Sequence, residues 1–130
     1  MRSLLLFGAA LHVVAAVGCV GKHPTTDLEG MVTVDGQAAA KGGLTFTPLA
    51  ANQGKGVFAP IANGRYQAKG VALGKTRVSF LLTKETGRMQ NVYGRDVPEL
   101  VNVLPPKYDA GMGIEIEPGQ MSRDFELRSQ

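Results

Sequence analysis

Residues 63–82 constrain the fold of this chain more than any other segment. They begin with Asn63-Gly64, two residues that tolerate positive φ and therefore favour a tight hairpin turn. A strand is expected to start directly afterwards, at Arg65. Further along, apolar and polar side chains alternate with the two-residue period of a half-buried strand, the apolar ones being Val78, Phe80 and Leu82.

Similar short runs recur along the chain, separated by Gly, Pro and Asn, with no amphipathic helical pattern after residue 20. The expected strands are 28–34, 44–48, 56–61, 65–68, 77–83, 113–117 and 123–128. Seven short strands at roughly 8–12-residue spacing predict an all-β fold, a single seven-stranded antiparallel β-sandwich of Ig-like type over residues 28–130. The expected core is Val32, Val34, Leu44, Phe46, Tyr66, Val78, Phe80, Leu82, Ile114, Ile116, Phe125 and Leu127.

The N-terminus has the pattern of an export signal. Arg2 precedes an apolar run over 4–17 that is too short for a comfortable membrane span. The run ends in Ala16-Val17-Gly18-Cys19, which resembles a bacterial lipobox, where the Cys becomes lipid-modified and is the first mature residue. Cys19 is the only Cys, so it has no disulfide partner within the chain. We predict a lipoprotein signal peptide over 1–18 and a tether over 19–27; an ordinary signal peptide with an incidental Cys19 is the alternative.

Turn and core residues follow one another in a characteristic order. The chain contains Gly30-x-Val32-x-Val34-Asp35-Gly36, Leu44-x-Phe46-x-Pro48, Asn63-Gly64-x-Tyr66 and Gly70-Val71-x-x-Gly74-x-x-x-Val78, and a tail with Leu104-Pro105-Pro106-Lys107-Tyr108-Asp109, Pro118-Gly119 and Phe125-Glu126-Leu127. This order resembles the carboxypeptidase regulatory-like domain, which has a transthyretin-like sandwich. With the lipobox, the chain is similar to small exported lipoproteins of planctomycete-type bacteria. The resemblance implies an accessory or interaction module and defines no functional residue.

Residues suited to catalysis are scarce. His23, the only His of the mature chain, lies in the tether, so there is no Ser–His–Asp set and no His-based metal site. Glu115 and Glu117 share one strand face, a pattern typical of a solvated surface. The basic residues are scattered without interleaved aromatics, which argues against nucleic acid as a partner. We therefore expect a protein that is not an enzyme and has no cofactor or metal.

The segment 84–107 is the longest stretch without strand periodicity, and such stretches are often functional or disordered. It combines charged side chains with aromatic ones. The candidate binding residues are Tyr93, Arg95, Asp96 and Tyr108. The alternative interpretation is a small core in which Tyr93, Tyr108 and Met89 pack the loop onto the sandwich.

These features predict a membrane-anchored lipoprotein of the bacterial cell envelope that acts as a non-catalytic structural or protein-interaction module. Its partners would be the membrane, through the lipid, and another envelope protein. A binding module for a saccharide or other small ligand is the alternative. Val20 follows Cys19 in place of the Asp that retains some lipoproteins in the inner membrane, so we expect the outer membrane, facing the periplasm.

Replacement of Cys19 tests the predicted lipid anchor. The Cys19→Ser variant should be soluble or remain unprocessed, because no thiol is left to receive the lipid. Mass spectrometry of the wild-type protein should find an acylated N-terminus at Cys19. A mature wild-type N-terminus without acyl chains would contradict the prediction.

Overall fold

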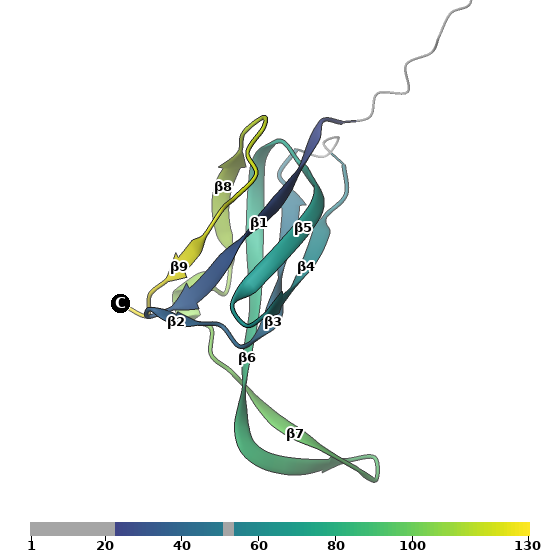
Figure 1. Ribbon diagram of the computed structural model, residues 1–130, viewed down its shortest axis with the longest axis vertical. Helices are drawn as coiled ribbons and strands as arrows, with labels where there is room; N and C mark the ends of the chain where they lie inside the picture. Colours follow the sequence, from purple (N-terminus) through teal and green to yellow (C-terminus); the bar gives the residue numbers. More distant parts are fainter. Residues whose placement is uncertain (1–22, 51–53) are drawn as a thin grey trace, which may run out of the picture.

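The computed structural model describes residues 23–50 and 54–130, and within them the protein is all-β without an α-helix (Figure 1). The elements are β1 (Thr25–Val34), β2 (Gln37–Ala38), β3 (Lys41–Pro48), β4 (Val57–Ala62), β5 (Arg65–Ala72), β6 (Gly74–Val92), β7 (Arg95–Asn102), the 3-10 turn η1 (Pro106–Tyr108), β8 (Met112–Ile116) and β9 (Phe125–Leu127). No helix in the described ranges is long and apolar enough to cross a membrane. The predicted signal peptide and Cys19 lie outside the described residues.

The strands form one curled sheet in the order β2-β1-β5-β4-β3-β6-β7 (Figure 1). β8 adds to β6, and β9 adds to β1. All pairings are antiparallel except β1–β9, which is parallel and departs from the predicted antiparallel arrangement. β6 is an interior strand of the body: Thr76 pairs with Pro48 of β3 on one edge and with Ile114 of β8 on the other.

The predicted core is largely confirmed. Every side chain of the predicted set is buried except Val34, which is partly buried and packs against the others. An aromatic cluster lies at its centre, where the Phe125 ring is 5.4 Å from Phe80, 5.9 Å from Tyr66 and 6.3 Å from Phe46, measured between centroids. The rings are tilted or edge-on, the geometries that aromatic pairs prefer. β9 therefore closes the core although it contains only Phe125–Leu127.

The segment leading into β9 lies tightly against β1. A Cβ atom at Gly30 would stand 2.0 Å from the carbonyl oxygen of Arg123, so only glycine permits this approach. The amide of Arg123 donates to the carbonyl of Glu29 at 3.0 Å. The hydroxyl of Tyr66, from β5, donates to the Arg123 carbonyl at 2.5 Å. These bonds fix the C-terminal segment across the open side of the curled sheet.

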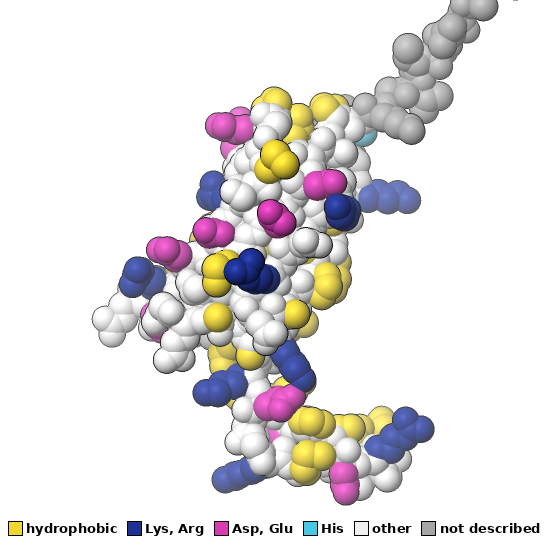
Figure 2. Space-filling view, viewed as in Figure 1, with side chains coloured by type: hydrophobic (Ala, Val, Ile, Leu, Met, Phe, Trp, Pro, Cys, Tyr) yellow, Lys and Arg dark blue, Asp and Glu magenta, His cyan; other side chains and the backbone are white. Residues whose placement is uncertain are grey.

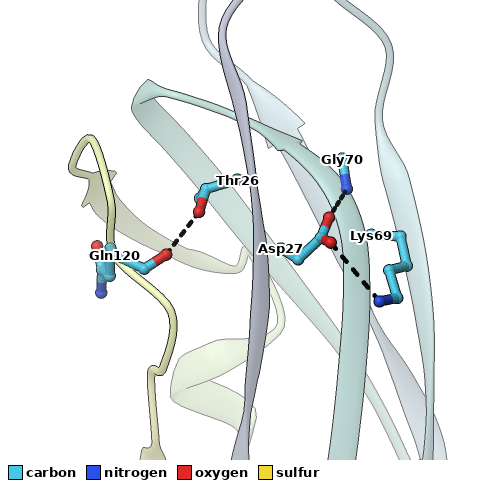
Figure 3. A network of polar contacts seen from close by, with 5 residues as sticks. All are labelled: Thr26, Asp27, Lys69, Gly70 and Gln120. Atoms are coloured by element: carbon cyan, nitrogen blue, oxygen red, sulfur yellow. Dashed lines mark hydrogen bonds and ion pairs between the residues drawn. The ribbon is translucent and has the colours of Figure 1, made fainter.

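A bulge in β5 strengthens the same region (Figure 3). Lys69 and Gly70 of β5 lie opposite Asp27 of β1, because Thr26 pairs with Val71 and Leu28 with Ala68. The Asp27 carboxylate accepts a hydrogen bond from the amide of Gly70 at 2.9 Å and lies 3.6 Å from the ammonium of Lys69. The bond from the Gly70 amide is the main reason that the pKa of Asp27 is lowered. The hydroxyl of Thr26 donates to the carbonyl of Gln120 at 2.6 Å, on the other side of β1.

Two sequence predictions are wrong in detail. Residues 84–107 are not an irregular loop, because most of them belong to the long hairpin of β6 and β7. No strand was expected between residues 34 and 44, but β2 and the beginning of β3 lie there. In both places the strands bury almost no side chains, so the apolar alternation that marks a strand in the sequence is absent.

Phe80 tests the position of the core. Phe80→Ala should lower the free energy of unfolding by about 3–5 kcal/mol, because it removes a buried ring in contact with Phe125 and Tyr108. Leu81→Ala, one residue along on the exposed face, should change it by less than about 1 kcal/mol. Thermal and urea denaturation measure both. Equal losses would show that the two faces of β6 are assigned incorrectly.

Candidate functional site: the β6–β7 arm

The hairpin of β6 and β7 projects from the body as a two-stranded ribbon, which we call the arm and define as residues 84–101 (Figure 1). Lys41, the first residue of β3, is the partner of Thr83, so β6 beyond that point pairs with β7 alone. The burial of β6 changes at the same position: Leu82 is fully buried, whereas Met89 is 62% exposed. The arm therefore contributes little to the core and is built almost entirely of surface.

The base of the arm is fixed by polar contacts. The ammonium of Lys41 lies 2.6 Å from the carboxylate of Glu85, which connects the arm to β3. Residues 86–88 then lie opposite Glu99 alone, because Glu85 pairs with Leu100 and Met89 with Pro98. This bulge contains Gly87 at φ 85°, and the hydroxyl of Thr86 donates to Glu99 at 3.0 Å. Bulges of this kind increase the local twist and redirect a ribbon.

The tip of the arm is a two-residue turn, Tyr93-Gly94, with φ of 52° and 82°. Positive φ at both positions is the type I′ geometry, which matches the twist of the flanking strands. The side chain of Asn91 holds the turn: its oxygen accepts from the amide of Gly94 at 3.1 Å, and its nitrogen donates to Asp96 at 3.1 Å. One side chain thus connects both strands and the turn.

Both edges of the arm are unsuited to the addition of another strand. In a two-residue hairpin closed by Val92 and Arg95, the Met89–Pro98 pair is a non-hydrogen-bonded one, so the nitrogen of Pro98 faces away from β6. That nitrogen has no hydrogen to donate, and proline on an edge hinders strand pairing. On the opposite edge the bulge at 86–88 interrupts β6. A binding partner is therefore expected to contact the side chains of the arm.

The surface of the arm mixes apolar and charged side chains (Figure 2). Among its large apolar residues, Tyr93 is 102% exposed and Met89 62%, followed by Leu100, Val101 and Val92. Three basic and three acidic residues accompany them: Lys84, Arg88, Arg95, Glu85, Asp96 and Glu99. Protein interfaces combine apolar contacts with a polar rim, and aromatic residues and Arg are enriched there.

The four predicted binding residues divide into two groups. Tyr93, Arg95 and Asp96 lie together at the tip of the arm. Tyr108 lies in the body, in η1, where its ring meets Phe80 edge-on at 6.3 Å and its hydroxyl accepts from the amide of Arg128 at 3.1 Å. The alternative was that Tyr93, Tyr108 and Met89 together pack this segment onto the sandwich. Tyr108 does pack on the body, but Tyr93 and Met89 are exposed.

Several residues of the arm were not singled out in the sequence analysis, notably Val92, Val97 and Leu100. Val97 lies opposite Gln90 and is followed by Pro98, so no run of alternating residues marks the strand. Gly94 is compatible with a hairpin turn, but the usual Asn or Asp before the Gly is missing, and charged residues, Arg95 and Asp96, follow it.

A depression of ≈ 450 Å³ lies at the base of the arm, between the β1–β2 turn and Thr83. Small or aliphatic residues form most of its wall, and no aromatic side chain lines it; the lining is Val34, Asp35, Gln37, Ala38, Ala39, Ala40, Thr83, Lys84 and Val103. The carboxylate of Asp35 is already engaged by the amide and hydroxyl of Ser129, at 2.9 and 2.8 Å, and these bonds lower its pKa. Within the described ranges no group of three or more metal-ligating side chains is present.

Shortening of the arm tests its independence from the core. A variant in which residues 86–99 are replaced by Asn-Gly should keep its fold, because the removed side chains are almost all exposed. Its melting temperature should differ from wild type by less than about 5 °C, which corresponds to less than about 1 kcal/mol for a domain of this size. Calorimetry measures this change. A loss of cooperative melting would show that the arm supports the body.

Comparisons with known proteins return no relative. No family model, no curated protein and no solved structure matches this chain.

Proposed function

We propose that this protein is a lipid-anchored, non-catalytic interaction module of the bacterial envelope, and that the arm is its contact with another envelope protein. The body would be a transthyretin-like sandwich whose curled sheet supports the arm. One observation carries the proposal: the arm exposes Met89, Tyr93 and Leu100 on a ribbon that has no core of its own.

The energetics of a two-stranded ribbon support this interpretation. An isolated hairpin is at best marginally stable in water, because it has no second layer on which to bury its side chains. Exposed apolar residues grouped on a projection and bordered by charges are typical of an interaction site. Burial against a partner would remove this apolar surface from water and would stabilise the ribbon at the same time.

The position of the arm fits a protein held to a membrane at its N-terminus. The first described residues and the beginning of β1 lie at one end of the body, and the arm leaves from the opposite end (Figure 1). A lipid on Cys19 would place the first end near the membrane, since only a few residues separate Cys19 from Thr25. The arm would then point away from that membrane, toward proteins or layers deeper in the compartment.

The alternative of saccharide or small-ligand binding has weaker support. Binding sites for such ligands are concave and combine apolar or aromatic walls with a few polar groups. The depression at the base of the arm has no aromatic wall, and its one carboxylate is engaged by Ser129. Tyr93 stands on a convex tip.

Capture from crosslinked envelopes tests the proposal. The full-length protein should retain a specific envelope protein, and the variant with residues 86–99 replaced by Asn-Gly should lose it. Met121→Ala, which removes an exposed apolar side chain from the body, is the matched control and should bind normally.

A different result is expected if the arm has only a protective role. If the arm instead protects an edge of the sheet, the shortened variant would self-associate in gel filtration while it still captured the partner. That combination would contradict a contact role for the arm.

A further inference from the structure

We propose that Tyr93 is the anchor residue of the arm, and that it inserts into an apolar pocket bordered by carboxylates on a partner protein. The inference rests on the proposed function and adds to it the residue and the chemistry of the partner. Three independent observations lead to it: the backbone conformation of Tyr93, its exposure, and the charges beside it.

The backbone conformation is the first observation. Among residues 23–50 and 54–130, three non-glycine residues have positive φ, and each begins a two-residue turn that ends in glycine: Asp35-Gly36, Asn63-Gly64 and Tyr93-Gly94, with first φ values of 49°, 51° and 52°. Asp and Asn adopt this conformation readily because their short side chains bond locally. Tyr gains no such bond and is strained there. At the same position in the same kind of turn, the arm carries the least suitable of the three residues.

Exposure is the second observation. The side chain of Tyr93 is 102% exposed, so its ring contributes no packing that would offset the strain. Tyrosine at position 93 therefore destabilises the turn and stabilises no other part of the described structure. A strained residue at such a position points to a role outside the folding of the chain. A tyrosine ring offers a large contact area at little cost in side-chain entropy, which makes it a common hot spot of protein interfaces.

The turn also presents the ring from a fixed position. Asn91 bonds the amide of Gly94 and the carboxylate of Asp96, both at 3.1 Å, and so holds the turn on both sides. An anchor that is held in place before binding loses less conformational freedom on association. These bonds also engage Asp96, the only acidic side chain among residues 88–98.

The charges beside Tyr93 indicate the chemistry of the partner. Residues 88–98 contain Arg88, Arg95 and Asp96, which gives this half of the arm a net charge of +1. In the described part of the chain neither arginine lies within ion-pair distance of a carboxylate. Both guanidinium groups are therefore available for bidentate contacts to acidic groups, which are among the stronger polar contacts at interfaces. A pocket with carboxylates at its rim complements an aromatic ring that has Arg95 two residues away and Arg88 further down the same ribbon.

A second copy of this chain fits the tip less well. Copies anchored in the same membrane leaflet through their N-termini would carry parallel arms, because the arm leaves the body opposite to the chain entry (Figure 1). Parallel arms would place Arg95 beside Arg95 and Tyr93 beside Tyr93. Like charges directly opposite one another are unfavourable. The membrane itself is also a poor candidate, since it would lie at the other end of the body.

Photo-crosslinking in cells that produce the protein identifies the molecule that contacts the tip of the arm. The full-length chain carries p-benzoylphenylalanine in place of Tyr93, and in a second sample in place of Phe58, an exposed aromatic on the body. We expect one protein adduct from position 93 that is absent from position 58. Peptide mapping should locate the crosslink beside Asp or Glu residues. Arg88→Glu with Arg95→Glu should abolish the adduct, and Lys55→Glu should not.

Binding of the mapped partner to the purified full-length protein then tests the side chain itself. Tyr93→Asn should weaken binding about thirtyfold or more, as loss of a hot-spot residue does. Asn suits this turn, so the variant should melt at the same temperature as wild type or higher. Tyr93→Phe, which keeps the ring, should bind nearly as well as wild type.

The contrary results separate this inference from the proposed function. If replacement of residues 86–99 by Asn-Gly abolishes binding but Tyr93→Asn does not, the arm is the contact and Tyr93 is not its anchor. Adducts only to a second copy, to lipid or to glycan, or no adduct at all, would likewise overturn the inference. If the shortened variant binds normally, the proposed function itself fails.

Discussion

The pairing between β3 and β6 ends at Lys41 and Thr83, and the arm exists because of that limit. From Thr76 to Thr83, β6 pairs with β3, and from Gly74 to Val78 it also pairs with β8; every second side chain from Thr76 to Leu82 is buried. Beyond Thr83, the same strand has only β7 as a neighbour and buries none. Since β6 continues through Thr83 without a break, the body sets the direction in which the arm begins, and the bulge at 86–88 then redirects the ribbon.

The body is a firm support because its C-terminal segment is fixed across the curled sheet. Gly30 leaves room for the carbonyl of Arg123, and the hydroxyl of Tyr66 bonds that carbonyl. β9 then delivers Phe125 into the centre of the aromatic cluster. Burial of these rings, rather than a disulfide, must hold the body together, because the chain contains a single Cys. A rigid body with a projecting contact element is a common arrangement for recognition.

The sequence predicted the parts of the fold that bury a face. Alternating apolar and polar residues around Phe46, Phe80 and Ile114 predicted strands. The residue pairs Asp35-Gly36 and Asn63-Gly64 are typical of tight turns. The arm was hidden because a ribbon exposed on both faces needs no alternation, and because Gly87 and Pro98 are typical of loops. Tyr108 was grouped with Tyr93 by nearness in sequence, although η1 returns it to the core. The resemblance to regulatory-like domains and the lipidation of Cys19 stay predictions.

Amide hydrogen exchange distinguishes an arm that contacts a partner from an arm that stays in solvent. The full-length protein is compared in two states, purified in detergent and retained in isolated envelopes. Amides of residues 84–101 should exchange quickly in the purified protein and become protected in envelopes, while amides of β3 and of β6 up to Thr83 should be protected in both. Arm amides that exchange equally fast in both states would show that the arm is not a contact element.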